Sequence, residues 1–129
     1  MKAKVKICGI RDCEEAIICV DAGADFFGFN FIENSKRFIK PKDALKIIKM
    51  LPLRVKKVGV FRNESMERVN SLIKYLKLDF VQLHGDESPN YVSKINIVGK
   101  IKVFSLGKNF DVKDILNQVE RYNTDYIFL

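Results

Sequence analysis

VKKVGVFRNESMERVNSLIKYLKLDFVQL, residues 55–83, is the stretch that decides the fold. Its two ends, residues 55–61 and 79–83, are short runs rich in valine, phenylalanine and leucine, as is typical of buried strands. Between them lie five apolar residues at helical spacing, namely Met66, Val69, Leu72, Ile73 and Leu76. That spacing predicts a helix with one apolar face. Because a tight hairpin cannot join parallel strands, the stretch predicts one parallel βαβ unit.

The same alternation extends along the whole chain and predicts a single α/β domain over residues 1–129, with no internal boundary. Six strand-like runs begin about 20 to 30 residues apart, as βα units require. They are residues 5–8, 25–31, 55–61, 79–83, 97–104 and 125–129. A second apolar stripe, expected on a helix against the sheet, comprises Val112, Ile115, Leu116, Val119 and Tyr122. The pattern therefore predicts a parallel sheet with helices outside it, as a (β/α) barrel or an open doubly wound sheet.

Local signals place several helix ends. Asp12 followed by Glu15 is a variant of the capping box, and Pro41 and Pro89 suit the first turn of a helix. Gly23 suits the carboxyl end of the first helix. The first strand–helix turn, residues 8–12, has no G-x-G-x-x-G motif, which disfavours the dinucleotide-binding form of the open sheet.

Composition excludes several classes of protein. With 47% apolar and 30% charged residues the chain is neither disordered nor membrane-spanning, and the basic residues 1–6 are not followed by the apolar segment of a signal peptide. We therefore expect a cytoplasmic protein. The net charge of +7 comes from lysines spread over every segment, which favours a solvated surface and a small anionic substrate and disfavours nucleic acid and membrane partners.

The cysteines, Cys8, Cys13 and Cys19, are odd in number and close together. That arrangement predicts no disulfide framework and a reducing compartment. A metal site is not expected, because there is no C-x-x-C pair and His84 is the only histidine.

The candidate site residues lie where strands end, since parallel β/α proteins place their chemistry at the carboxyl ends of strands. Period-two alternation puts Lys6 and Cys8 on one face of the first strand, and Gln82 and His84 on one face of the fourth. We expect these faces to point into the interior of a barrel or into the site above it, and the apolar faces to pack against helices. A buried Lys6 requires a carboxylate partner, which the sequence does not identify.

Each candidate site residue has a functional and a structural interpretation. Cys8 is either a general base or nucleophile, or a small buried apolar residue, whereas Cys13 and Cys19 fit the apolar role on the first helix. Arg37 either binds a carboxylate bidentately or is an ordinary surface residue. His84 either does acid–base work or caps a loop.

Together the strand ends resemble the phosphoribosylanthranilate isomerase family of tryptophan biosynthesis. The motifs K-I-C-G-I, S-x-R and V-Q-L-H-G occur here in the family's order and spacing. The matching stretches are residues 5–10, 23–25, 28–31, 35–37, 58–61 and 81–87. The resemblance covers the whole chain and implies a parallel (β/α)8 barrel of the TIM type. A barrel acting on another sugar phosphate is disfavoured, because it has no obvious use for Cys8 together with Arg37.

The resemblance also implies an activity. The family converts N-(5′-phosphoribosyl)anthranilate to 1-(2-carboxyphenylamino)-1-deoxyribulose 5-phosphate by an Amadori rearrangement, without metal or organic cofactor. Its general base matches Cys8, and its anthranilate-binding arginine matches Arg37. Gln82 and His84 match the family's fourth-strand motif and are expected to line the substrate site.

The chain departs from the family at its end. The family's general acid is an aspartate at the end of the sixth strand, which is expected just beyond Leu129, and the phosphate-binding loops come later still. The resemblance therefore implies a C-terminally truncated barrel of six strands. We expect this chain alone to be inactive. The alternative to the isomerase is a catalytically inactive half-barrel fragment that self-associates or pairs with a missing C-terminal part.

Overall fold

The computed structural model describes residues 2–96 and 99–129, so the first two residues of the predicted strand 97–104 lie outside the described residues. Six parallel strands form one sheet in chain order. They are β1 (Lys6–Cys8), β2 (Phe26–Asn30), β3 (Lys56–Phe61), β4 (Phe80–Leu83), β5 (Gly99–Val103) and β6 (Tyr126–Phe128). The helices are α1 (Cys13–Asp21), α2 (Pro41–Met50), α3 (Met66–Leu76), α4 (Pro89–Ser93) and α5 (Val112–Val119). Within these described parts, no helix is long and apolar enough to span a bilayer.

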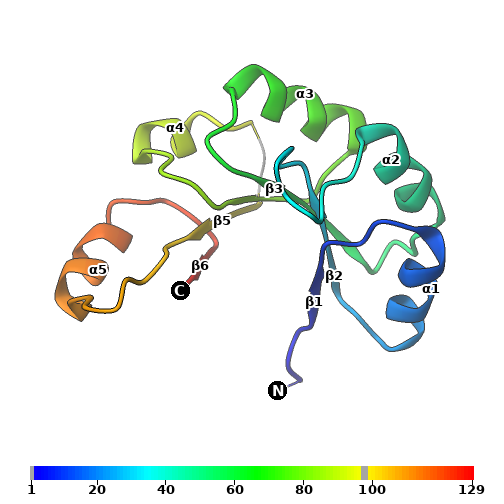
Figure 1. The fold of residues 1–129 in the computed structure, drawn as a ribbon, viewed down its shortest axis with the longest axis horizontal. Helices are drawn as coiled ribbons and strands as arrows, with labels where there is room; N and C mark the ends of the chain where they lie inside the picture. The colour runs from blue at the N-terminus through cyan, green and yellow to red at the C-terminus, as the bar shows by residue number, and fades with distance from the viewer. Residues whose placement is uncertain (1, 97–98) are drawn as a thin grey trace.

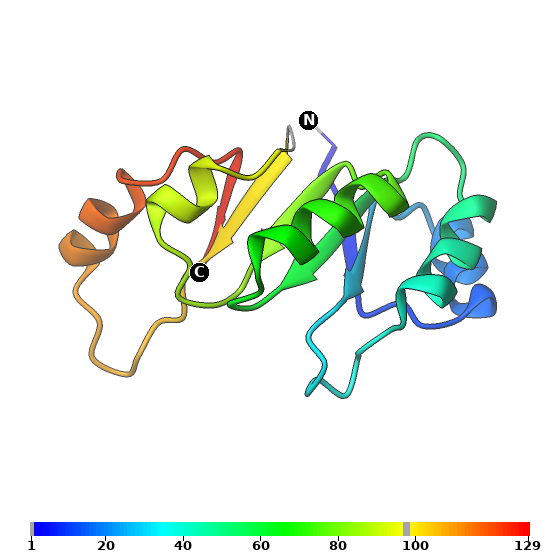
Figure 2. The same ribbon diagram turned by 90° about the horizontal axis from the view of Figure 1, so that it is seen from above.

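The sheet is curled, and the helices cover its convex face (Figure 1). Among residues 2–96 and 99–129 no helix lies on the concave face, and the C-terminal strand β6 ends on that side (Figure 1). Seen from above, α1 and α5 lie at opposite ends of the molecule (Figure 2). This confirms the prediction of an incomplete parallel barrel with six strands, and not an open doubly wound sheet.

The apolar core lies between the sheet and the helices, as the alternation predicted. Large buried side chains of the convex face are Phe27, Phe29, Phe61, Val81 and Leu83. The predicted stripe of α3 packs against this core, with Val69, Leu72 and Leu76 buried. Such close packing of aliphatic and aromatic groups is the main stabilising contribution to a small α/β domain.

Two parts of the apolar pattern do not follow the prediction. The stripe of α5 is largely uncovered, since Val112 is 60% and Leu116 56% exposed. The reason is position, because α5 lies at the end of the molecule and is not among the helices that pack closely on another described element (Figure 1). Val5 also fails to pack under a helix and is 47% exposed, because it precedes the first paired residue of β1.

Helix caps form where the sequence predicted them. The side chain of Asp12 accepts the N–H of Glu15 at 2.8 Å, while the Glu15 carboxylate reaches the N–H of Arg11, one residue before the cap. Pro41 and Pro89 occupy the first residues of α2 and α4. These side chains fix where α1, α2 and α4 begin, and so they fix the lengths of the preceding loops.

Three aspartates join neighbouring strands at their amino ends. One of them lies just before β2, one just before β4 and one just before β6. The backbone N–H of each aspartate donates to the carbonyl of a residue at or directly before the start of the neighbouring strand, and the aspartate carboxylate accepts the backbone N–H of that same residue. The pairs are Asp25 with Val5, Asp79 with Lys57 and Asp125 with Lys100, with N–H to carboxylate distances of 2.9, 2.8 and 2.8 Å. We call them the aspartate clamps. They set the register of the amino ends and leave the carboxyl ends open to form a site.

Candidate functional site

A cavity of about 390 Å³ lies at the carboxyl ends of the first four strands. Its lining residues are Cys8, Asn30, Ile32, Asn34, Ser35, Arg37, Val60, Arg62, Gln82 and His84. The four residues singled out from the sequence therefore meet in one place. Strand register explains this, because Asn30, Val60 and Gln82 are paired in one row across β2, β3 and β4. Cys8 is paired with Gly28, which lies two residues before Asn30 and therefore on the same face of the sheet.

Cys8 lies on the concave face beside a glycine that leaves room for its side chain. A Cβ added to Gly28 would lie 3.0 Å from Cys8 Sγ and 3.0 Å from Lys6 Nζ. Sγ of Cys8 and Nζ of Lys6 are therefore no farther apart than the sum of these two distances. No carboxylate within the described residues forms an ion pair with Lys6, so the partner expected from the sequence is not found there.

Arg37 is placed next to Cys8 by a second glycine. Gly9 follows Cys8 directly and has φ +89°, in the left-handed region that favours glycine. A Cβ added to Gly9 would lie 2.6 Å from Cδ of Arg37, so the aliphatic part of Arg37 lies against the glycine backbone. Arg11 adds a further tie, because its Nη1 donates to the carbonyl of Lys36 at 3.1 Å.

The loop that carries Arg37 is held by Asn30 and Ser35. Asn30 Nδ2 donates to Ser35 Oγ at 3.1 Å, and that hydroxyl accepts the N–H of Arg37 at 3.2 Å. Asn30 Oδ1 also accepts the N–H of Ile32 at 2.8 Å. Asn30 was not among the predicted site residues, although it is the one polar residue of the strand Phe26–Asn30. It fixes the loop and lines the cavity at the same time.

Gln82 lines the cavity and has one hydrogen-bonding group that is unused in the described structure. The residue is 5% exposed, and its Oε1 has no hydrogen-bond partner within the described part of the chain. A buried carbonyl oxygen without a partner loses its hydrogen bonds to water and gains none from the protein, which is unfavourable, so such atoms commonly mark a binding position. His84, the next residue on this face, is exposed, and its backbone N–H donates to the carbonyl of Phe61 at 2.9 Å.

The charge of the lining suits an anion. It holds Arg37 and Arg62, and none of its ten residues is an aspartate or glutamate. Cys13 and Cys19 lie outside the cavity and pack partly buried against the core, as the apolar reading predicted. Across residues 2–96 and 99–129, no group of three or more histidine, cysteine or acidic residues is arranged to hold a metal ion.

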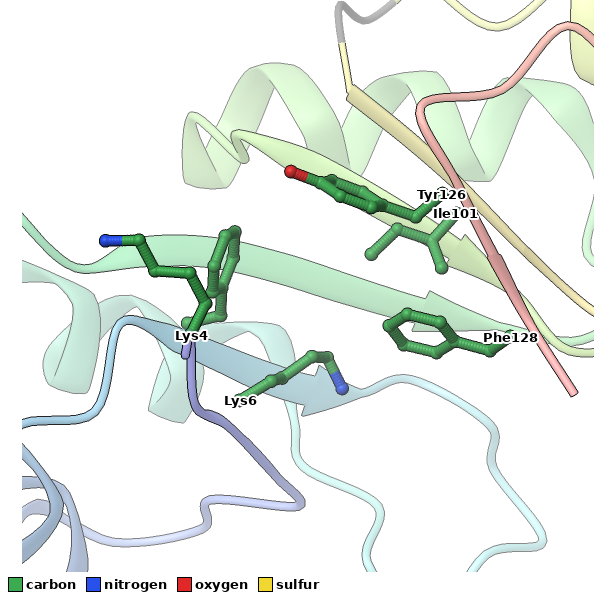
Figure 3. A pocket seen from close by; sticks show the side chains of 6 residues that line it. Lys4, Lys6, Ile101, Tyr126 and Phe128 are labelled. Atoms are coloured by element: carbon green, nitrogen blue, oxygen red, sulfur yellow. The ribbon is translucent and has the colours of Figure 1, made fainter. Parts of the chain in front are cut away.

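A second hollow lies on the concave face (Figure 3), and it shares no lining residue with the first cavity. Its lining is mainly apolar and comprises Lys4, Lys6, Phe26, Ile101, Tyr126 and Phe128. Lys6 and Phe128 point toward one another from the two edge strands of the sheet (Figure 3). The hollow is the open interior of the curled sheet, whereas the first cavity has the polar groups that chemistry requires.

Comparison with known proteins assigns the chain to a family. The sequence profile described as "N-(5'phosphoribosyl)anthranilate (PRA) isomerase" matches residues 5–128. The chain belongs to this isomerase family. An N-(5'-phosphoribosyl)anthranilate isomerase of Bacillus cereus (strain B4264) is 46% identical over 124 residues, which make up 96% of this chain and 58% of that relative.

Solved structures of the isomerase family have the same fold. The crystal structure of phosphoribosyl anthranilate isomerase from Thermotoga maritima matches with a TM-score of 0.87 at 39% identity, over 98% of this chain and 61% of that one. Another was determined in complex with reduced 1-(o-carboxyphenylamino)-1-deoxyribulose 5-phosphate, and it matches with a TM-score of 0.80 at 36% identity, over 98% and 74% of the two chains. The chain spans about half the length of the relatives it matches in sequence.

One buried group was missed by reasoning from the isomerase family's strand ends. Glu87 and Lys102 form an ion pair at 3.1 Å, with side chains that are 2% and 3% exposed. From the sequence, Lys102 is one of many scattered lysines and Glu87 is one of two acidic residues in a loop. Only the pairing of β4 with β5 brings them together.

Proposed function

We propose that this protein isomerises N-(5′-phosphoribosyl)anthranilate by an Amadori rearrangement, as a step of tryptophan biosynthesis. One observation carries the proposal: three separate segments, which are β1 with Cys8, the loop after β2 with Arg37 and the end of β4 with Gln82 and His84, line one cavity. A cavity with two arginines and no carboxylate in its lining suits a substrate that carries a carboxylate and a phosphate.

Cys8 is the general base of the proposed reaction. Opening of the ribose ring gives a protonated imine, and the proton on C2′ becomes acidic because it is next to the iminium carbon. The thiolate of Cys8 takes that proton, the electron pair forms the enolamine, and the enolamine becomes the ketone of the product. A moderately basic group in the right position suffices for such a proton. Gly28 provides that position by leaving room beside Sγ.

Arg37 binds the anthranilate carboxylate, and Gln82 and His84 line the sugar. A guanidinium matches a planar carboxylate with two parallel hydrogen bonds, which fixes the aromatic ring and the adjacent sugar carbons. Oε1 of Gln82, which has no hydrogen-bond partner in the described structure, would accept a hydrogen bond from a hydroxyl or amine of the substrate. Ring opening also needs a proton donor on the ring oxygen, and we assign it to an aspartate directly after Leu129, by the family resemblance.

The first experiment measures binding of reduced 1-(o-carboxyphenylamino)-1-deoxyribulose 5-phosphate by titration calorimetry. We expect the protein to bind it, and Arg37→Ala to weaken binding about tenfold or more, because a charge-assisted pair is lost. The control is Arg121→Ala, whose side chain is exposed after α5 and outside the cavity lining. No binding by the protein would overturn the proposal, and equal binding by the two variants would remove Arg37 from the site.

The second experiment measures turnover of N-(5′-phosphoribosyl)anthranilate by the native protein and by Cys8→Ala. We expect kcat to fall by about 100-fold or more, because a general base commonly contributes that much. Binding of the reduced analogue and the far-ultraviolet circular dichroism spectrum should stay unchanged. Turnover close to that of the unmodified protein would show that Cys8 is not the base.

A second candidate role follows from the uncovered concave face. The apolar residues Ile101, Tyr126 and Phe128 line an open hollow, and both edge strands have an unpaired side. A half-barrel of residues 1–129 that is truncated at its C-terminus would bury these groups by self-association or by pairing with a missing C-terminal part. Such a fragment alone would be inactive, because the cavity lining holds no acidic residue. Measurable turnover by a purified chain of 129 residues would exclude this role.

A further inference from the structure

The ion pair of Glu87 and Lys102 is buried where the loops of the candidate site meet. In the other ion pairs among the described residues, both side chains are at least 22% exposed. Burying two charges is unfavourable unless their remaining hydrogen-bonding groups are satisfied. The other hydrogen bonds of the two side chains therefore show which parts of the backbone the pair holds.

Lys102 binds the ends of β4 and β5. Its Nζ donates to the carbonyl of Gly85 at 2.6 Å and of Val103 at 3.2 Å, and it lies 3.4 Å from the carbonyl of Leu83. With Glu87 Oε2 at 3.1 Å, four acceptors surround three N–H groups. The ammonium is thus fully used inside the protein, and it bridges two strand ends.

Glu87 binds the loops after β3 and β4. Its Oε1 accepts the N–H of Asn63 at 2.8 Å, and its Oε2 accepts the N–H of Gly85 at 3.0 Å. Asn63 has φ +49°, and its Oδ1 accepts the N–H of Asp86 at 2.7 Å. The carboxylate therefore holds the two loops against each other through backbone groups.

We propose that Glu87 and Lys102 are positioning residues for His84 and Arg62 at the rim of the substrate cavity. His84 lies between Leu83 and Gly85, and the pair binds the backbone of both neighbours. Arg62 directly precedes Asn63, whose N–H is bound by Glu87. The inference rests on the proposed function, because it treats the cavity lined by His84 and Arg62 as the place where the substrate binds.

The alternative is that the pair only stabilises the fold. An apolar pair of the same size can equal or exceed a buried ion pair in stability, so stability alone does not require charges here. An apolar pair would leave the N–H groups of Asn63 and Gly85 without their acceptor and would free the loops to move. The two explanations therefore differ in what happens to His84 and not in the free energy of unfolding.

The test compares the double variant Glu87→Gln/Lys102→Met with a matched control, Lys57→Met/Asp79→Asn. The control pair also joins two strands, at 3.3 Å, but at the amino ends of β3 and β4. His84 is the only histidine, so its imidazole gives an assignable proton NMR signal without further labelling. We expect one His84 signal in the unmodified protein and in the control, and a shifted, broadened or multiple signal in the Glu87/Lys102 variant.

The second readout is binding of the reduced analogue by calorimetry. We expect about tenfold weaker binding in the Glu87/Lys102 variant and unchanged binding in the control, with the same circular dichroism spectrum. An unchanged His84 signal with unchanged affinity in the folded variant would overturn the inference. If the double variant does not fold, the isosteric Glu87→Gln alone is judged by the same readouts. Failure of the unmodified protein to bind the analogue overturns the proposed function, and the His84 spectra still decide whether the pair positions that residue.

Discussion

Two glycines place the reactive side chains of the candidate site. Gly28 leaves space for Cys8 and Lys6, and Gly9 lets Arg37 lie against the backbone directly after Cys8. Neither glycine carries chemistry, and each acts by having no side chain. A glycine with the same backbone conformation but no neighbouring side chain can therefore separate two effects of substitution, namely the strain in the backbone and the displacement of a site residue.

Gly9→Ala and Gly23→Ala form that comparison. Both glycines have φ +89°, but a Cβ at Gly9 meets Arg37 whereas a Cβ at Gly23 has nothing within 4 Å. We expect both variants to lose about 1 kcal/mol of unfolding free energy from the left-handed conformation. Only Gly9→Ala should bind the reduced analogue more weakly, by about tenfold, because it displaces Arg37. Chemical denaturation and calorimetry measure the two effects, and equal affinity of the two variants would contradict this account.

At the scale of residues, the sequence predicts which side chains lie at the ends of strands, but it does not predict which residues those side chains contact. Cys8, Arg37, Gln82 and His84 could be selected because the carboxyl ends of parallel strands converge. Lys102 could not, because a lysine in a strand is ordinarily a solvated residue, and its burial depends on a glutamate fifteen residues away across a strand pair.

At the scale of elements, the aspartate clamps hold the sheet at the end opposite to the site. The backbone N–H of Val5 lowers the pKa of the Asp25 carboxyl below its ordinary value of 3.8, and the ammonium of Lys4 lowers it further. A carboxyl whose pKa is depressed by folding stabilises the fold above the pKa of the unfolded chain, and that contribution is lost as the pH falls through the lower, folded value. The clamp should therefore weaken only in acid.

Asp25→Asn tests this dependence. We expect the variant to be less stable than the unmodified protein by a constant amount from pH 7 to about pH 5, where Asp25 is ionised in both states. The difference should shrink as the pH falls below the ordinary pKa of 3.8, because the unfolded chain takes up its proton there, and it should vanish below the lower pKa of the folded state, where the native carboxylate is protonated too. Urea denaturation at a series of pH values measures it, with Asp21→Asn at the exposed end of α1 as control. A difference that stays constant down to pH 2 would contradict the assignment.

The helices show where prediction from pattern fails. The apolar stripes of α3 and α5 look alike in sequence, and both predict a helix with one buried face. The helices formed in both cases, but Leu72 of α3 is buried and Leu116 of α5 is 56% exposed. Spacing reports the shape of a helix, whereas burial depends on whether a neighbouring element is there to cover it.

At the scale of the whole molecule, exposed apolar residues occur at both ends of the sheet. Ile17 and Ile18 on α1 are 48% and 68% exposed, and Val112 and Leu116 on α5 are exposed to a similar degree. In a linear sheet of six strands, β1 and β6 each keep one unpaired edge. Unpaired edges beside exposed apolar groups favour association with another chain.

We therefore expect a chain of these 129 residues to associate in solution. Sedimentation should give a mass above the 14.9 kDa of one copy. Ile18→Lys and Leu116→Lys should shift the distribution toward single copies, because a charge at either end disfavours burial of that surface. Tyr75→Lys on α3 is the control, since it is also exposed but lies away from both ends. A single species at 14.9 kDa in the unmodified chain would show that the ends do not associate.

The aspartate clamps have a consequence for how the protein is made. Each clamp closes between residues only 20, 22 and 25 positions apart in the chain. As the polypeptide emerges from the ribosome, β1 with β2 can close before β3 is synthesised, and the next pairs follow in the same way. We therefore expect the sheet to form pair by pair in chain order, with the candidate site completed only when neighbouring pairs dock.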